Sequence, residues 1–454
     1  MMARADRVPS KAALAGPGGI GLAGLGRVRA MGSVAWLVWR TSVRGALGWS
    51  LVVGVVIVFN ALGYARSFPE AADREGAAAS MQSGGIRLLF GTALHVDSVT
   101  GFTSWRAPLL SLILSVWAIG VAARVFRGAE ENGTWSVLCG GQLTRNEVFG
   151  SVSAGLSFLA APVWAVLCAA TIVSVATTGN LESMPDCGYF AAVVMMPSLV
   201  GFGVGALTSQ LMAHRRSALG LSIVVIAALY LGRGVADVRD SSLVWLSPFG
   251  WVEKAEALIA PKYGVVWLFA GTTSALLAAA WAAQRHRDLS GSIVKARDRR
   301  PDRPAWLGSV LQGQARFNAR QTVGWTAGLV LLGLVTAVVT DEGGELTAAS
   351  EQLGVILGET GQYDGAQGYL SLVFMALGTV VALAAAGDVM SVLRQETSGQ
   401  SRTLLARPVS RIVLLGADVI TDLAALAVAM AGAAAGVWLA LLSQEADLSL
   451  PECL

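Results

Sequence analysis

Long stretches without a charged residue constrain this chain more than any other feature. A helix that crosses the hydrocarbon of a bilayer needs about 20 apolar residues, because hydrocarbon solvates neither charges nor unpaired backbone groups. Nine such stretches occur between the charged residues at 44–66, 106–124, 147–182, 186–215, 216–233, 262–285, 320–341, 364–388 and 422–445. The 216–233 stretch is the shortest. We therefore predict an all-α polytopic membrane protein with about nine transmembrane helices.

The composition supports a membrane protein. Of 454 residues, 54% are hydrophobic and 14% are charged, whereas a soluble domain carries roughly 25% charged residues. The net charge of +3 gives no reason to expect nucleic acid as a partner. The four cysteines show neither CxxC spacing nor neighbouring histidines, so we expect no metal site, no cofactor and no disulfide framework in this chain.

Basic residues near membrane segments usually stay on the cytoplasmic side, so their distribution predicts the orientation. They are concentrated in the amino-terminal tail and in the segment 285–303, while the loop 341–364 carries acidic residues and no Lys or Arg. We expect a multi-pass protein of a bacterial plasma membrane with a cytoplasmic N-terminus. The predicted parts are a Gly/Ala-rich cytoplasmic tail (1–33), a first six-helix repeat (34–285), a basic cytoplasmic linker (286–315) and a second repeat (316–454).

The evidence for a repeat is a constant offset between similar segments. Five pairs of identical residues lie 266 positions apart, namely Glu130/Glu396, Gly133/Gly399, Leu138/Leu404, Arg145/Arg411 and Gly150/Gly416. An offset of 276 aligns "RTSVRGALGW" from Arg40 with "RFNARQTVGW" from Arg316. We predict two copies of a six-helix unit, and both copies have the same orientation in the membrane. The second unit has only three predicted spans, so the sequence is expected to be incomplete at its C-terminus by roughly 80–90 residues.

The best-preserved part of the repeat follows the second span of each half. Each copy has an acidic residue three positions before a glycine and then an amphipathic stretch, which is typical of a segment lying along the membrane surface. In the first copy we expect Trp135, Val137, Leu138 and Leu143 to face lipid or protein, and Arg145 and Glu147 to face water. Two ordinary surface loops are the alternative. Because both copies keep one register, we favour a docking surface for a twofold-symmetric soluble partner.

The stretch "RQETSGQSRTLLARPVSR" (394–411) resembles the segment after the second helix in permeases of ABC-2 type exporters. Two fused six-helix halves, and "WLSPFGW" at 245–251, are similar to the actinobacterial antibiotic-exporter permeases of the tetronasin-resistance type. The first copy departs from the pattern, with Gly141 and Gln142 where the second has Arg407 and Pro408.

The resemblance implies that this chain is the permease subunit of an ATP-driven exporter of hydrophobic or amphiphilic, antibiotic-like compounds. The residues in segments touching two ATP-binding subunits would be Glu130, Gly133 and Arg145, and Glu396, Gly399, Pro408 and Arg411. Gly133 and Gly399 would permit the turn into the surface segment, because glycine tolerates positive φ. ATP and Mg²⁺ would be bound by a separate, homodimeric ATPase, since this chain has no GxxxxGK[ST] phosphate loop and no expected catalytic residue.

Two further features leave alternatives open. Asp418 and Asp422 lie near the expected cytoplasmic start of the ninth span, and such a polar pair would suit an ion-coupled secondary transporter. A non-transporting membrane scaffold is the second rival. The exterior segment 233–263 mixes aromatic and charged residues, which favours a short interfacial or re-entrant helix in an exit gate, or a plain loop.

Overall fold

The computed structural model describes residues 17–81, 87, 90–141, 143–287, 310–337 and 410–442. All regular secondary structure within these ranges is helical, so the predicted all-α class is confirmed. The chain divides into two compact units, Met1–Arg66 with Phe90–Ala296, and Ser67–Leu89 with Arg297–Leu454. The second division point falls inside the predicted linker 286–315.

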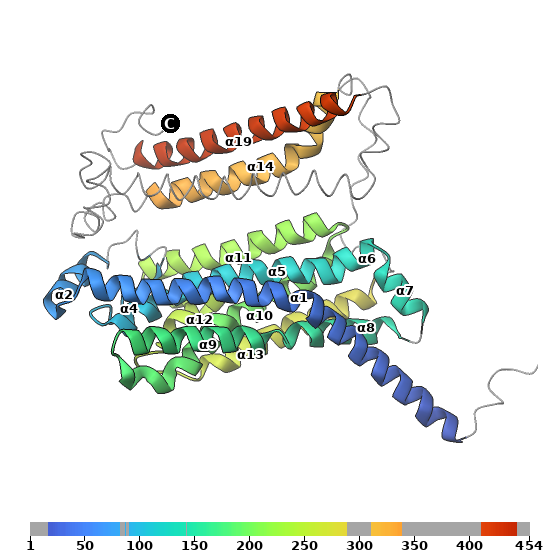
Figure 1. The fold of residues 1–454 in the computed structure, drawn as a ribbon, viewed down its shortest axis with the longest axis horizontal. Helices are drawn as coiled ribbons and strands as arrows, with labels where there is room; N and C mark the ends of the chain where they lie inside the picture. Colours follow the sequence, from blue (N-terminus) through green and yellow to red (C-terminus); the bar gives the residue numbers. More distant parts are fainter. Residues whose placement is uncertain are drawn as a thin grey trace, which may run out of the picture. The chain divides into compact units, whose positions relative to one another are not determined.

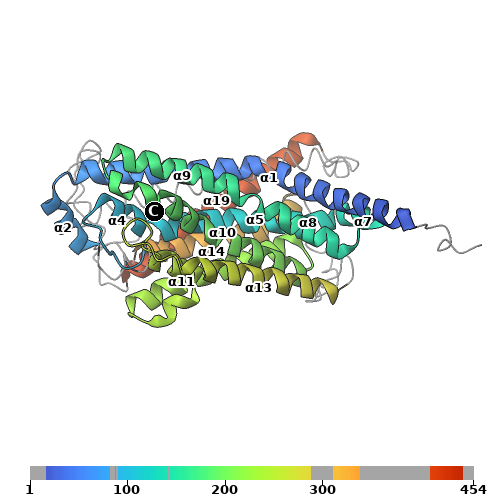
Figure 2. The same ribbon diagram turned by 90° about the horizontal axis from the view of Figure 1, so that it is seen from below.

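The first unit is a bundle in which the long helices run side by side along one axis (Figures 1 and 2). In chain order its elements are α1 (Pro17–Ser67), α4 (Val99–Trp105), α5 (Ala107–Ala123), the π-helical turn η2 (Arg124–Gly128), α6 (Ala129–Glu131), α7 (Thr134–Gly140), α8 (Arg145–Ser157), α9 (Ala160–Thr177), η3 (Leu181–Asp186), α10 (Cys187–Leu211), α11 (Arg215–Val238), η4 (Ser242–Leu246), α12 (Pro248–Lys254) and α13 (Val265–Arg285). The second unit contains α2 (Ala71–Ser80), α14 (Val310–Ala337) and α19 (Arg411–Leu442).

Seven helical segments in the described ranges are long and apolar enough to cross a membrane. Six belong to the first unit and match the six predicted spans, including the short fifth one, which is α11. The seventh segment is α19, the predicted ninth span. The predicted seventh span is helical in α14, and the eighth, at 364–388, lies outside the described residues. The chain is therefore a polytopic all-α membrane protein.

Two helices begin earlier than their apolar stretches. The helix α1 starts at Pro17, so the segment predicted as a tail is already helical from that residue. Its N-terminal part extends past the end of the bundle at which α7 lies (Figure 1). The helix α19 starts at Arg411 rather than near Asp422. Charged residues limit the hydrocarbon-spanning part of a helix, but they do not end the backbone hydrogen-bonding pattern.

The third span is divided into α8 and α9, and its start has a sequence signature. The Thr144 hydroxyl accepts a hydrogen bond from the Glu147 backbone N–H at 3.3 Å, and the Glu147 carboxylate accepts one from the Thr144 backbone N–H at 2.6 Å. This capping box satisfies backbone donors that have no partner within the helix. It fixes where the chain turns from α7 into the bundle.

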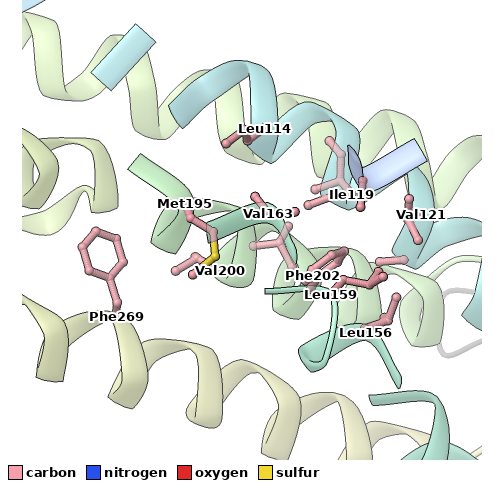
Figure 3. Close-up of a cluster of buried hydrophobic side chains, with 14 of the residues drawn as sticks. Leu114, Ile119, Val121, Leu156, Leu159, Val163, Met195, Val200, Phe202 and Phe269 are labelled. Carbon is pink, nitrogen blue, oxygen red and sulfur yellow. The ribbon is translucent and has the colours of Figure 1, made fainter. Parts of the chain in front are cut away.

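The helix α10 is the centre of the first unit. Figure 3 shows apolar side chains from α5, α8, α9, α10 and α13 gathered around it. Small residues bring α10 close to α5, since a Cβ added to Gly205 would lie 2.6 Å from the Ala122 Cβ. Close approach through small residues is the usual way to pack helices in lipid, where the hydrophobic effect does not drive them together.

The helices α14 and α19 of the second unit approach each other in the same manner. A Cβ added to Gly333 would lie 2.6 Å from the Ala433 carbonyl oxygen, and one added to Gly436 would lie 2.4 Å from that of Val330. Glycines on both helices therefore set the distance between them.

Candidate functional site

The surface segment after the second span forms a short helix at one end of the first unit. The chain runs from α5 through η2 and α6, and then turns at Gly133, whose φ is +75°. The positive φ predicted for this glycine is confirmed. The helix α7 follows directly, and it lies at the end of the bundle opposite α4 (Figures 1 and 2).

The helix α7 has a buried side and an exposed side. Trp135 is 2% exposed, and its indole Nε1 donates a hydrogen bond to the Val125 carbonyl oxygen at 3.2 Å. Val137 is 78% exposed, while Leu143 after the helix is buried. Cys139 on the same helix is partly covered, which raises the pKa of its thiol. The helix is thus anchored by Trp135 and presents Val137 to its surroundings.

Directly before α7 in the chain lies Glu130, whose side chain is 2% exposed and is the centre of a cluster of buried charges. Its carboxylate contacts three guanidinium groups, those of Arg287 at 2.8 Å, Arg127 at 3.0 Å and Arg145 at 3.8 Å. We call Arg127, Glu130, Arg145, Arg287 and Gln210 the Glu130 cluster. Two predicted site residues, Glu130 and Arg145, are therefore brought together.

The exposure expected for Arg145 was wrong in part. Its side chain is 21% exposed, because it turns toward Glu130 and donates a hydrogen bond from Nη1 to the Arg287 carbonyl oxygen at 2.5 Å. The guanidinium group lies close enough to the buried carboxylate for charge attraction, although 3.8 Å is too long for a hydrogen bond.

Sequence analysis missed Arg287 and Gln210. Arg287 lies within the predicted linker, yet its side chain is 3% exposed. Its guanidinium donates to the Gln210 Oε1 from Nη2 at 2.6 Å and from Nε at 2.9 Å, in addition to its contact with Glu130. An arginine in a basic segment looks like a solvated charge, and the sequence carries no local signal that it folds back into the bundle.

The loop between α10 and α11 is bound to the same segment. Arg127 donates from Nε to the Ala213 carbonyl oxygen at 2.9 Å, and its Nη2 donates to the same oxygen. The Glu131 carboxylate accepts a hydrogen bond from the Arg215 backbone N–H at 2.7 Å. Residues 127–131 therefore connect the ends of α8, α10, α11 and α13, which meet at this end of the bundle.

A second group of buried charges lies near α12, outside the Glu130 cluster. Arg233 contacts the Glu253 carboxylate at 3.3 Å, and the Thr92 hydroxyl donates to the Asp237 carboxylate at 2.7 Å. Burial is the main cause that raises the pKa of the Glu253 carboxyl group, and Asp237 adds to it, while Lys254 and Arg233 oppose the shift. The short helix predicted within 233–263 is confirmed as α12.

The remaining predicted site residues are only partly described. Arg411 is the first residue of α19 and is exposed, while Glu396, Gly399 and Pro408 lie outside the described residues. Asp418 is 6% exposed within α19, beside Gln314 of α14, and Asp422 is half-buried. Within the described ranges, no group of three or more His, Cys, Asp or Glu side chains could hold a metal ion.

Comparisons with known proteins fit this arrangement. Residues 307–454 match the family described as "Multidrug efflux system permease Rv1217c, C-terminal domain". The chain is also 27% identical to the multidrug efflux system permease protein Rv1217c of Mycobacterium tuberculosis (strain ATCC 25618 / H37Rv) over 380 residues, which cover 82% of this chain and 67% of the relative. The chain is homologous to a multidrug efflux permease. The similarity over 82% of the chain includes the Glu130 cluster, and the family match over 307–454 includes the helices α14 and α19.

Proposed function

We propose that this chain is the membrane-spanning subunit of an ATP-driven ABC exporter that moves hydrophobic or amphiphilic, drug-like compounds out of the cell. The observation that carries the proposal is α7, an anchored surface helix with Val137 exposed, which follows in the chain directly after the buried Glu130. The homology of this chain to a multidrug efflux permease supports drug-like compounds as the substrate class. A separate homodimeric ATPase would bind ATP and Mg²⁺ and dock on α7 and on its counterpart in the second half.

The proposal includes two fused halves of ABC-2 type, and matched helix starts support it. The helix α8 begins at Arg145 and α19 begins at Arg411, which are 266 residues apart. The residue before each helix caps it, since the Ser410 hydroxyl accepts from the Val413 backbone N–H at 3.3 Å as Thr144 does from Glu147. The same type of helix start at two positions 266 residues apart supports the proposed duplication.

Matched helix contacts give independent support for the duplication. A Cβ on Gly54 of α1 would lie 2.9 Å from the Ala170 Cβ of α9. At the offsets of 276 and 266 these two residues correspond to Val330 and Gly436, whose helices α14 and α19 make the same close contact. In this alignment the glycine of the contact lies on the first helix of one pair, α1, and on the second helix of the other pair, α19. The two close contacts lie at corresponding positions.

Ion coupling remains the alternative that a specific observation favours. Asp418 is buried within a helix long enough to span the membrane, and ionisable residues in such places often serve transport. Replacing Asp418 and Asp422 by asparagine would abolish transport by an ion-coupled carrier, whereas an ATP-driven exporter should retain most of its transport.

A pull-down with the ATP-binding subunit encoded beside this gene tests the main proposal. The wild-type protein in detergent should retain the subunit, and Val137→Asp should lose it, because a charge replaces the exposed apolar side chain of α7. The control is Val238→Asp, which changes an exposed valine at the end of α11 away from the Glu130 cluster. Equal retention by both variants would refute docking on α7, and no retention by the wild type would count against the exporter.

A further inference from the structure

We propose that Arg287 is a positioning residue that makes α7 and the end of α13 move as one body, so that movement of the ATPase reaches the chain leading into the second half. The inference builds on the proposed function, because it concerns how a docked ATPase acts on the bundle. Arg287 lies two residues after the end of α13, at the start of the predicted linker and still within the first unit.

The contacts of Arg287 connect three parts of the bundle. Its guanidinium binds Glu130, which follows η2 and precedes α7, and Gln210 at the end of α10. Its carbonyl oxygen accepts a hydrogen bond from Arg145 at the start of α8. The Arg287 side chain is 3% exposed and is held by charge-assisted hydrogen bonds. In a closely packed interior it therefore cannot move with one of these partners while the others stay in place.

Burial separates this role from docking. The Glu130 and Arg287 side chains are 2% and 3% exposed, so neither can form the surface that a soluble partner touches. The exposed part of α7 includes Val137, and Trp135 connects the helix to η2 through its bond to Val125. Docking and transmission therefore use different side chains and can be separated by mutation.

The π-helical turn η2 is the point at which the segment from α5 to α7 can bend. It lies between α5 and α6 and ends at Gly128, so the backbone changes its hydrogen-bonding pattern two residues before Glu130. Single π-turns inside longer helices occur often at functional sites, and they are one of the recognised causes of a sharp bend. Bending at η2 would move α7, and the contact between Glu130 and Arg287 would make the end of α13 move in the same direction.

The experiment measures the distance between Asn132, at the turn that leads into α7, and α13 in the full complex. Spin labels are placed at Asn132→Cys and Ala282→Cys, both exposed positions, after the native cysteines are replaced by serine. Distances are recorded with the ATP-binding subunit bound, without nucleotide and with ADP trapped by vanadate. Arg287→Gln, Arg287→Lys and the control Arg285→Gln are compared, since Arg285 is exposed and lies over the Trp281 ring at 3.6 Å.

We expect one unchanged distance in both states for the unmutated background and for Arg285→Gln. Arg287→Gln should retain the ATP-binding subunit but show a shifted or broadened distance on trapping, with stimulation of ATP hydrolysis by the permease reduced about tenfold. Arg287→Lys, which keeps the charge, should be intermediate, and it decides the matter if Arg287→Gln does not fold.

Two results would overturn the inference. One is an unchanged distance and full stimulation in both Arg287 variants, which would mean that Arg287 transmits nothing. The other is loss of the ATP-binding subunit to the extent seen for Val137→Asp, which would make Arg287 a support of the docking surface. Failure of the proposed function is recognised separately, because the unmutated protein would then not bind the subunit at all.

Discussion

At the scale of single residues, Trp135 and Val137 give a matched test of how α7 is held. Trp135 is 2% exposed and Val137 is 78% exposed, although they lie two positions apart. Trp135→Ala should lower the free energy of unfolding by about 3–5 kcal/mol, the usual cost of deleting a large buried side chain. Val137→Ala should leave the thermal midpoint in detergent unchanged. Equal midpoints for the two variants would show that the indole does not anchor α7.

The charge cluster shows what a sequence can and cannot reveal about a site. The sequence predicts Glu130, Gly133 and Arg145 together because all three recur at one offset, and the resemblance implies the turn at Gly133, where φ is positive. Their partners Arg287 and Gln210 are 157 and 80 residues away from Glu130 in the sequence. Long-range pairing depends on how the helices pack, and no local pattern encodes it.

At the scale of helices, two glycines of α19 should respond in opposite ways to the same substitution. A Cβ on Gly436 would lie 2.4 Å from the Val330 carbonyl oxygen, so Gly436→Ala must push α14 and α19 apart at a cost of about 1–3 kcal/mol. Gly416 has no atom within 4 Å of the added Cβ. Gly416→Ala should stabilise the helix by about 0.5–1 kcal/mol. Thermal unfolding in detergent measures both, and a stabilised Gly436→Ala variant would contradict the close crossing.

The segment around α12 should make stability depend on pH through Glu253. Its pKa is raised above the ordinary value of 4.5 by burial and by Asp237, against the opposing charges of Lys254 and Arg233. The folded protein therefore binds this proton more tightly than the unfolded chain, and the contribution to stability is lost as pH rises from 4.5 through the raised value. Glu253→Gln should flatten the fall in thermal midpoint between acidic and neutral pH. An unchanged slope would assign the dependence to another group.

The helices themselves were largely predictable, because the bilayer imposes a length of about 20 apolar residues on each span. The predictions failed at helix ends, where α1 and α19 continue past charged residues. They also failed to foresee the division of the third span after Ser157 and the π-turn η2. These details depend on contacts between neighbouring helices, such as the approach of Gly155 to the Ala35 carbonyl oxygen, and composition does not report them.

At the scale of the whole molecule, the proposed mechanism requires α7 to face the cytoplasm, where ATP is available. The prediction follows from basic residues that gather at this end of the first unit, among them Arg145, Arg215 and Arg285. Single cysteines at Gly140 and Leu246 suit a labelling test, because both positions are exposed and the second lies in η4, in the loop that joins α11 to α12. In intact cells a membrane-impermeant maleimide should label Leu246→Cys and should label Gly140→Cys only after permeabilisation. The reverse pattern would place α7 outside, where no ATPase could reach it, and would remove the basis for ATP-driven export.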